Sequence, residues 1–302
     1  MTHAPYRGRF APTPSGALHF GSLVAAVGSY LEAKSRGGEW RLRIDDLDPP
    51  RVARGAVESI LRCLEALGFE WDGPIIYQSR RVPAYHAALH ELRALGAVYP
   101  CACSRKEIAE SALPGKESRI YPGVCRDGLP LGRRARALRL RVEGMRIEFE
   151  DGLLGPQRRD FAREYGDFVL YRADGVYAFH LASAVDDAEY GMTDVVRGAD
   201  LLESSARQLE LVRLLGHRAP RYVHLPVAVD RRGEKLSKQT NAVPVDPACP
   251  LGALQAVLRF LNQSGPAQSE RVTLDEFWRH ATSHWDLQRV GTRLTLPVPD
   301  LK

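Results

Sequence analysis

The fold is decided by Arg7-Gly-Arg-Phe-Ala-Pro-Thr-Pro-Ser-Gly-Ala-Leu-His-Phe-Gly-Ser22. Residues 9–11 of this segment are typical of the end of a short strand, and the Pro- and Gly-rich turn that follows excludes helix. An apolar run, Leu23 to Leu31, then predicts a helix that ends near Gly37. A strand, a tight turn and a helix N-terminus in this order place an anion on free backbone N–H groups.

Three residues at the start of this helix suit a phosphate ligand. His19 can donate a hydrogen bond from either ring nitrogen, and Ser22 could cap the helix. Gly21 has no Cβ, so a ligand can approach the backbone closely. A turn with this composition is more often structural than functional when it stands alone.

A second motif, Lys235-Leu-Ser-Lys-Gln239, makes the functional interpretation the stronger one. With His-x-Gly-x at 19–22, it resembles the two signature motifs of class I aminoacyl-tRNA synthetases. The longer strings RFAPTPSGALHFGS and RIDDLDPPR (residues 43–51) resemble the glutamyl-tRNA synthetase branch. The resemblance runs from about Arg9 to Gln239. It implies an α/β fold: a Rossmann-type parallel-sheet catalytic domain.

The resemblance also implies a nucleotide site that uses ATP and Mg²⁺. The implied catalytic residues are His19, Gly21, Lys235 and Lys238, and the implied ATP-binding residues are His19, Gly21, Ser22 and Lys238. Joining a carboxylate to the α-phosphate of ATP builds negative charge on phosphorus and pyrophosphate. Preorganised positive charge and a helix N-terminus stabilise that charge. Without the other motifs, the two lysines would read as a solvated surface turn.

The implied glutamate site comprises Arg9, Thr13, Asp45, Phe179 and Arg197. Each arginine can grip a carboxylate through its planar guanidinium group. Asp45 would pair with the substrate ammonium. Three positions depart from the family pattern: Thr13 stands for Ser, Asp45 for Glu and Phe179 for Tyr. The shorter Asp45 and the lost hydroxyl at 179 put tight glutamate binding in question.

A cysteine cluster, Cys101-x-Cys103 followed by Cys125, suits tetrahedral Zn²⁺ in a structural role. The residues alone leave the fourth ligand open among Glu107, Glu117, Tyr121 and water. Resemblance to the short glutamyl-synthetase-like family makes Tyr121 the fourth ligand. Three unliganded thiols are the alternative. An odd total of five cysteines, without a secretory signal, argues against a disulfide framework.

The periodicity predicts alternating strands and helices interrupted by an insertion. We expect helices at 52–67, 82–95, 204–215, 251–261 and 274–282, strands at 40–44, 167–171 and within 222–230, and a hairpin formed by 137–142 and 145–149. The predicted divisions are 1–98 and 156–245 for the two catalytic halves, 99–155 for the zinc-binding insertion, and 246–302 for a short helical C-terminal segment without an anticodon-binding domain.

Composition and charge bound the class of protein. The chain has 302 residues, 44% hydrophobic and 26% charged, an ordinary globular balance. No apolar run long enough to span a membrane and no signal-peptide core is present, so we expect a cytoplasmic protein, as a monomer. A net charge of +5 with a pI of about 9.0 favours an anionic partner such as RNA. Arg136, Arg139 and Arg141 could contact phosphates or form an ordinary exposed strand face.

The hypothesis that follows is an enzyme resembling the short paralogues of glutamyl-tRNA synthetase, the glutamyl-queuosine tRNA(Asp) synthetases. These enzymes activate glutamate with ATP and transfer it to queuosine in the anticodon loop of tRNA(Asp). Residues 240–302 follow the lysine motif, so we expect no anticodon-binding region after it. The alternatives are glutamylation of a tRNA 3′ end, a class I nucleotidyltransferase acting on another acid, and a non-catalytic RNA-binding module.

Overall fold

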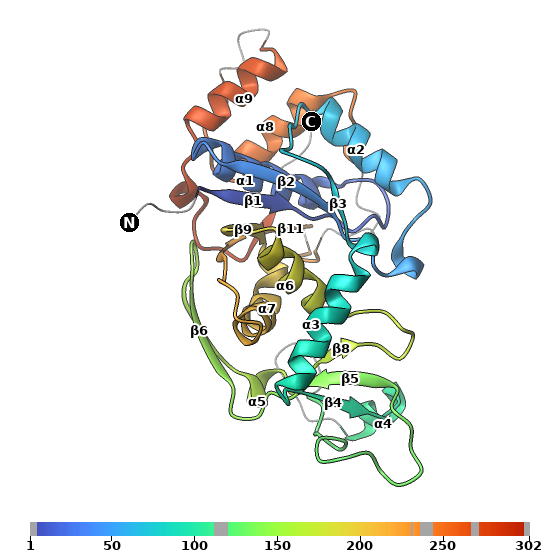
Figure 1. Cartoon of the computed structure of the whole chain (residues 1–302). Helices are drawn as coiled ribbons and strands as arrows, with labels where there is room; N and C mark the ends of the chain where they lie inside the picture. Colours follow the sequence, from blue (N-terminus) through green and yellow to red (C-terminus); the bar gives the residue numbers. More distant parts are fainter. Residues whose placement is uncertain (1–4, 112–119, 231, 236–243, 267–271, 299–302) are drawn as a thin grey trace.

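The computed structural model describes residues 5–111, 120–230, 232–235, 244–266 and 272–298. A layered α/β body lies at one end of the molecule and a smaller sheet at the other (Figure 1). The strands are β1 (Arg7–Phe10), β2 (Glu39–Ile44), β3 (Ile76–Tyr77), β4 (Val98–Cys101), β5 (Ala137–Leu140), β6 (Arg146–Asp151), β7 (Gly155–Asp160), β8 (Val169–Tyr171), β9 (Asp194–Gly198), β10 (Arg221–Leu225), β11 (Val227–Val229) and β12 (Thr295–Pro297).

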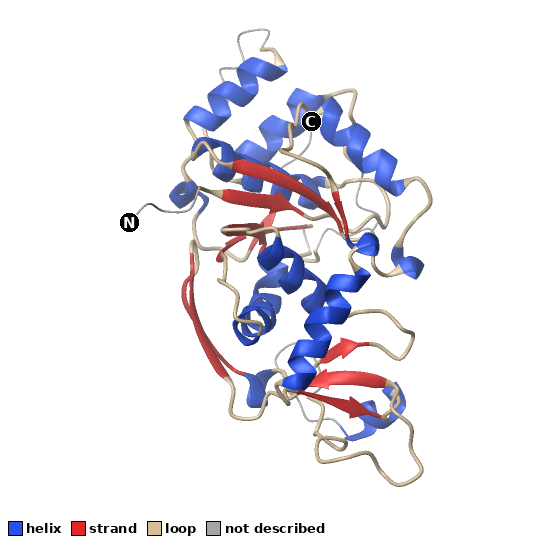
Figure 2. Cartoon of the chain, viewed as in Figure 1, coloured by secondary structure: helices blue, strands red, loops and turns tan. Residues whose placement is uncertain are grey.

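Helices alternate with these strands through most of the described chain (Figure 2). They are α1 (Phe20–Ser35), α2 (Ala56–Ala66), α3 (Val82–Ala94), α4 (Arg105–Ser111), α5 (Phe161–Glu164), α6 (Phe179–Glu189), α7 (Leu202–Leu214), α8 (Pro250–Phe260) and α9 (Leu274–Ser283). The helix predictions are confirmed, with ends shifted by a few residues. The largest shift is at α2, where a 3₁₀ turn at Pro49–Arg51 delays the start to Ala56.

The central strands are parallel, as the α/β pattern predicts. β1 pairs with β2, β2 with β3, and β10 pairs with both β9 and β6. The backbone N–H of Thr193, just before β9, donates to the carbonyl of Arg7 at 2.9 Å and joins the two groups of strands. β1 and β9 therefore lie side by side, so their carboxyl ends open onto the same edge, where α/β proteins bind ligands.

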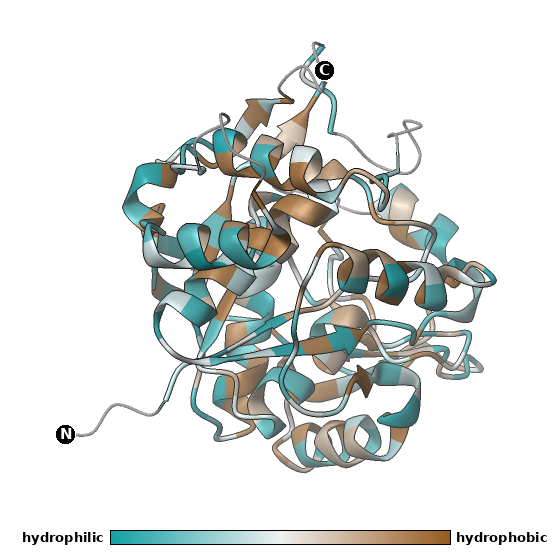
Figure 3. Cartoon of the chain, turned by 90° about the horizontal axis from the view of Figure 1, so that it is seen from above, coloured by the Kyte–Doolittle hydropathy of each residue, from teal (hydrophilic) through white to brown (hydrophobic). Residues whose placement is uncertain are grey.

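Helix α1 packs directly on this parallel sheet, on the face opposite α6 and α7 (Figure 1). A Cβ on Gly28 would meet the side chain of Leu225 at 2.4 Å, so glycine is what allows this close approach. The first apolar cluster joins α1 to residues of α8 and α9, including Phe277 and Trp278. Trp278 Nε1 donates to the carbonyl of Leu67 at 2.9 Å. Seen from above, the helices carry hydrophilic and hydrophobic residues on different sides (Figure 3).

The predicted hairpin between 137–142 and 145–149 is wrong. Both segments are strands, but β5 pairs antiparallel with β4 and β8, whereas β6 pairs with β7 and β10. Alternating hydrophobicity identifies which side chains share a face, but it does not identify the partner strand. Asp167 accepts a hydrogen bond from the backbone N–H of Val142 at 2.9 Å, at the point where the chain leaves the small sheet.

Two other features differ from or add to the sequence analysis. Arg139 is only 7% exposed, so an exposed strand face is the wrong interpretation for it. Its guanidinium lies 4.0 Å from the centre of the Tyr121 ring and donates to the carbonyl of Asp167 at 2.8 Å. The C-terminal tail forms β12, which pairs in parallel with β11. No helix in the described ranges is long and apolar enough to cross a membrane.

Replacing Phe277 by alanine tests the packing of α9 on the main core. Phe277 is fully buried, so Phe277→Ala should lower the free energy of unfolding by about 3–5 kcal/mol. Leu131, which is fully exposed, provides the control, and Leu131→Ala should change this free energy by less than about 0.5 kcal/mol. Urea unfolding followed by circular dichroism measures both. Equal effects of the two substitutions would contradict the packing described here.

Candidate active site

The N-terminus of α1 forms the first part of the candidate site. His19 is the N-cap residue: its Nδ1 accepts from the backbone N–H of Ser22 at 3.3 Å, and its Nε2 lies 3.1 Å from the Ser22 hydroxyl. The sequence suggested that Ser22 caps the helix. The structure shows that the capping side chain is that of His19. Gly21 lies in the first turn, which contains no acidic residue. Positive backbone dipoles without a competing carboxylate suit a phosphate group.

The lysine motif is described only at Lys235; Lys238 lies outside the described residues. The ammonium group of Lys235 forms an ion pair with Asp200, in the turn after β9. Six residues after the motif, the backbone N–H of Val245 donates to the carbonyl of Leu18 at 2.9 Å, close to the start of α1. Lys235 thus lies at the turn after β9, and Val245 lies near the α1 N-terminus.

A buried network of charges forms the second part. Arg9 on β1 binds Asp187 on α6 through two hydrogen bonds of 3.0 and 3.1 Å. Asp187 also accepts from Arg43 at 2.7 Å, and Arg43 binds Asp45 at 2.6 and 3.3 Å. All four side chains are at most 7% exposed. Burial alone would raise the pKa of Asp187, but its two arginine partners lower it to about 2.

Arg197, at the same sheet edge on β9, is a buried cation with a different environment. Its guanidinium donates to the side chains of Gln208 and Ser205, both at 2.8 Å, and to the carbonyl of Leu201 at 3.3 Å. None of these acceptors is a carboxylate. Burial, with the nearby charge of Arg9, lowers the pKa of Arg197 to about 10. An anion placed beside Arg197 would therefore be strongly favoured.

The structure brings four of the five residues proposed for the glutamate site to adjoining elements. Arg9 and Arg197 lie on neighbouring strands. Asp45 directly follows β2, and its backbone N–H donates to the carbonyl of Pro12, the residue before Thr13, at 3.0 Å. Phe179 is the first residue of α6, 37% exposed, two helical turns before Asp187. No described contact joins Phe179 to either arginine.

Two details differ from the pattern read in the sequence. The guanidinium forks of Arg9 and Arg197 already bind protein acceptors, so neither presents a fully open fork. Asp45 is engaged by Arg43, a residue to which the sequence analysis gave no role although it quoted the string containing it. Asp187 was also missed. The signal that could have revealed it is a pair of aspartates, Asp186-Asp187, directly after the apolar stretch 181–185 of a helix.

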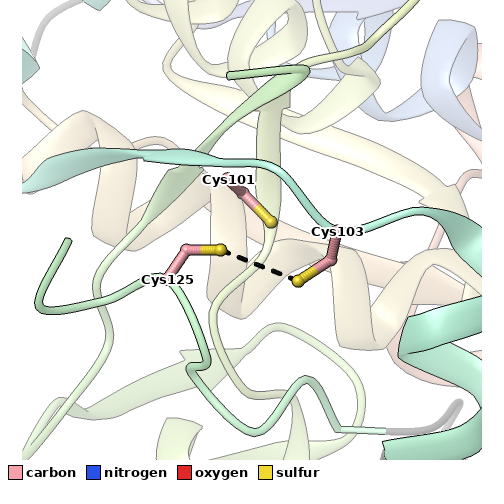
Figure 4. Close-up of side chains that lie close together, drawn as sticks. All are labelled: Cys101, Cys103 and Cys125. Atoms are coloured by element: carbon pink, nitrogen blue, oxygen red, sulfur yellow. Dashed lines mark hydrogen bonds between the residues drawn. The ribbon is translucent and has the colours of Figure 1, made fainter. Parts of the chain in front are cut away.

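The three cysteines converge at the end of β4. Cys101 and Cys103 lie on or beside this strand, Cys125 comes from a separate loop, and the sulfur atoms face one another (Figure 4). All three lie within 4.8 Å of one another. The Sγ atoms of Cys103 and Cys125 are 3.7 Å apart, and the Tyr121 hydroxyl lies 3.5 Å from Cys101 Sγ and from Cys103 Sγ.

These separations match the edges of a tetrahedron around zinc. Ligands at about 2.3 Å for sulfur and about 2.0 Å for oxygen lie roughly 3.5–3.8 Å from one another in that geometry. Glu107 binds Arg133 and the backbone N–H of Ser104, so it is committed elsewhere. Glu117 lies outside the described residues. The cysteine cluster could therefore hold a zinc ion.

The buried network around Asp187 gives a prediction about stability. Asp187→Asn should lower the free energy of unfolding by about 3–5 kcal/mol at neutral pH, because it leaves Arg9 and Arg43 partly uncompensated. The folded-state pKa of about 2 lies below the value of about 3.9 in an unfolded chain. The ionised Asp187 thus stabilises the fold above pH 4, and this contribution disappears as the pH falls towards 2.

Urea unfolding of both proteins between pH 3 and 7 measures this difference. The gap between wild type and Asp187→Asn should be constant above about pH 5 and should narrow below pH 4. A gap that is small, or that does not change with pH, would show that the carboxylate contributes little to stability.

Comparison with known proteins adds to this geometry. Residues 6–249 match the family model of the catalytic domain of class I tRNA synthetases (E and Q). A glutamyl-Q tRNA(Asp) synthetase of Aromatoleum aromaticum is 55% identical over 98% of this chain and 93% of its own length. Those of Chromobacterium violaceum and Pseudomonas aeruginosa are 54% and 48% identical, over 99% and 97% of this chain and 100% and 97% of theirs.

A solved structure shares the fold. The crystal structure of a glutamate-tRNA synthetase from Elizabethkingia anophelis superposes with a TM-score of 0.80 and 26% identity. The match covers 98% of this chain and 68% of that protein. The expected α/β class with parallel strands is thus confirmed both by the strand pairing and by this comparison.

Proposed function

We infer the function of this chain from its family: it belongs to the class I synthetases for glutamate and glutamine, within the group of glutamyl-Q tRNA(Asp) synthetases. It is a ligase that activates glutamate with ATP and transfers the glutamyl group to queuosine in tRNA(Asp). In the first step the glutamate carboxylate attacks the α-phosphate and pyrophosphate leaves. In the second step a queuosine hydroxyl forms an ester and AMP leaves.

The observation that carries the glutamate specificity is the buried guanidinium of Arg197, none of whose described hydrogen-bond acceptors is a carboxylate. Arg9 and Arg43 are matched by the two carboxylates that they bind, those of Asp45 and Asp187, and no described ion pair joins either carboxylate to Arg197. A second carboxylate on the amino acid would therefore give Arg197 the charged hydrogen-bond partner that it lacks among its described acceptors. Glutamate carries that carboxylate, and glutamine does not. Discrimination between the two amino acids is large, because bound glutamine would leave the buried charge of Arg197 unpaired.

The remaining site residues take the following roles in this proposal. His19, Gly21 and Ser22 bind the ATP phosphates at the N-terminus of α1, and Lys235 and Lys238 supply positive charge to the transferring phosphate and pyrophosphate. Mg²⁺ accompanies ATP. Thr13, Asp45 and Phe179 line the amino-acid end. The protein acts in the cytoplasm, as a monomer.

Attachment of labelled glutamate to tRNA(Asp) tests the acceptor. The protein, ATP and labelled glutamate should modify tRNA(Asp) that carries queuosine, through an alkali-labile ester. Removing the 3′-terminal adenosine should leave the labelling unchanged, because that nucleoside is not the acceptor. The matched control is tRNA(Asp) lacking queuosine, which should remain unlabelled. Label on the terminal adenosine, or equal labelling of both tRNAs, would favour glutamylation of a tRNA 3′ end instead.

We further propose that zinc is held by Cys101, Cys103, Cys125 and Tyr121, with a structural role. Four protein ligands leave no open position for substrate. The backbone N–H of Cys125 donates to the Tyr121 hydroxyl oxygen at 2.9 Å, which would stabilise negative charge on that oxygen. Burial, followed by the neighbouring thiols, raises the pKa of Cys103 to about 11, so a bound cation must displace its proton.

Elemental analysis of the freshly purified protein tests the metal. We expect one zinc per chain, and Cys103→Ser should lose it because a serine hydroxyl binds zinc more weakly than a thiolate. Cys249 is exposed and lies outside the cluster, so Cys249→Ser should retain the metal. Wild-type protein without zinc, or zinc retained by Cys103→Ser, would contradict the assignment.

A further inference from the structure

A chain of three buried side chains lies directly behind Arg197. Asp151 at the end of β6 accepts from His224 Nδ1 on β10 at 2.5 Å. His224 Nε2 lies 2.9 Å from the hydroxyl of Ser205 on α7, and this hydroxyl accepts from Arg197 Nη2 at 2.8 Å. All three are at most 2% exposed, so this chain of hydrogen bonds does not contact solvent.

Asp151 fixes the direction of the hydrogen bond to His224, and through it the tautomer of the imidazole. Its Oδ1 accepts from the backbone N–H groups of Leu153 and Leu154, at 3.0 and 2.9 Å, so its Oδ2 faces His224. Burial would raise the pKa of Asp151, but His224 and the backbone N–H groups of Leu153 and Leu154 together outweigh it and lower this pKa. An ionised carboxylate can only accept, so the proton of the neutral imidazole sits on Nδ1 and Nε2 presents a lone pair.

That lone pair determines what Arg197 can do. The Ser205 hydroxyl lies 2.9 Å from Nε2 and 3.3 Å from the carbonyl of Leu201, so its single proton goes to the closer Nε2 and its lone pairs face Arg197. Arg197 Nε also points at Nε2, at 3.4 Å. With the bonds to Ser205, Gln208 and the Leu201 carbonyl, the described acceptors occupy four of the five guanidinium N–H groups. The remaining N–H, on Nη1, is the one available to a ligand.

We propose that Asp151, His224 and Ser205 are positioning residues that hold the Arg197 guanidinium in the one orientation that presents its remaining N–H to a substrate carboxylate. This inference rests on the proposed function, which makes Arg197 a glutamate-binding residue. None of the three touches the substrate. Their order, acid, histidine and hydroxyl, resembles that of a hydrolase triad. However, the Ser205 hydroxyl is buried and bound to Arg197, so here the three side chains orient the Arg197 guanidinium.

The substitution Asp151→Asn tests this with almost no change in shape. The amide oxygen of Asn must take the Oδ1 position, because Leu153 and Leu154 donate there, so the amide nitrogen would face His224. The imidazole would then accept at Nδ1 and carry its proton on Nε2, pointing at Arg197 and Ser205. Ser205 can then turn its own proton to the carbonyl of Leu201, but the Nε–H of Arg197, 3.4 Å from Nε2, would face another donor, so the guanidinium should turn away from its binding orientation.

We expect Asp151→Asn to raise the Kd for glutamate by about 10- to 100-fold, the scale of one hydrogen bond to a charged group, with the Kd for ATP unchanged. Calorimetry measures both constants. The ¹⁵N chemical shifts of the His224 ring give an independent readout, because the proton should move from Nδ1 to Nε2. Ser205→Ala, which removes the link itself, should also weaken glutamate binding without changing the tautomer.

Asp167→Asn is the matched control. Asp167 is a buried aspartate that accepts a backbone N–H from Val142 and side-chain bonds from Arg126 and Tyr99, with no contact to Arg197. It should lose stability but keep its affinity for glutamate. If wild type does not bind glutamate, the proposed function fails and the positioning role with it. If wild type binds glutamate and both Asp151→Asn and Ser205→Ala bind it equally well, only the positioning role is overturned.

Discussion

The charge pair between Arg9 and Asp187 is the interaction on which the rest of the site depends. It joins β1 to α6, two elements separated by most of the catalytic fold in sequence, through hydrogen bonds of 3.0 and 3.1 Å. The same carboxylate binds Arg43 on β2 at 2.7 Å. A buried carboxylate with a single arginine would be neutral overall. Asp187 is shared between two arginines, and Asp45 balances the second of them, so the buried cation without a bound carboxylate at this edge is Arg197. An amino-acid substrate with an extra carboxylate is the natural counter-ion.

Much of this site was readable from the sequence because its chemistry depends on local motifs. The turn before His19 and the Cys-x-Cys pair can be recognised from their composition and spacing. The resemblance to the family supplied the positions of Arg9, Asp45 and Arg197. The helices were found because their apolar spacing is regular over many residues. What the sequence did not reveal is pairing. The residue types at positions 43 and 187 do not indicate that Arg43 binds Asp187, because 144 residues separate the two in sequence.

The error at residues 137–149 has the same origin. β5 and β6 are both correctly recognised as strands, and a short connection makes a hairpin the default expectation. Their partners lie elsewhere because Asp167 captures the backbone at Val142, and Arg139 turns inwards onto the Tyr121 ring. Strand β5 pairs with β4 and supplies Arg139, and therefore packs against the cysteine cluster. Strand β6 joins the catalytic sheet and places Asp151 beside His224. One short connection thus separates a structural role from a role at the site.

The turn after β9 links the two halves of the reaction centre. Arg197 lies near the end of β9, and the carbonyl of Leu201 accepts from its guanidinium at 3.3 Å. Between them, Asp200 forms the ion pair with Lys235 of the lysine motif. Two adjacent residues, Asp200 and Leu201, therefore contact a lysine proposed to act on ATP and the candidate carboxylate-binding arginine, respectively. A movement of Lys235 towards phosphate must release Asp200, whose charge lies near Arg197. When Lys235 moves away, Asp200 loses its ion-pair partner, and its negative charge then acts on Arg197 alone. Binding of glutamate and binding of ATP should therefore not be energetically independent.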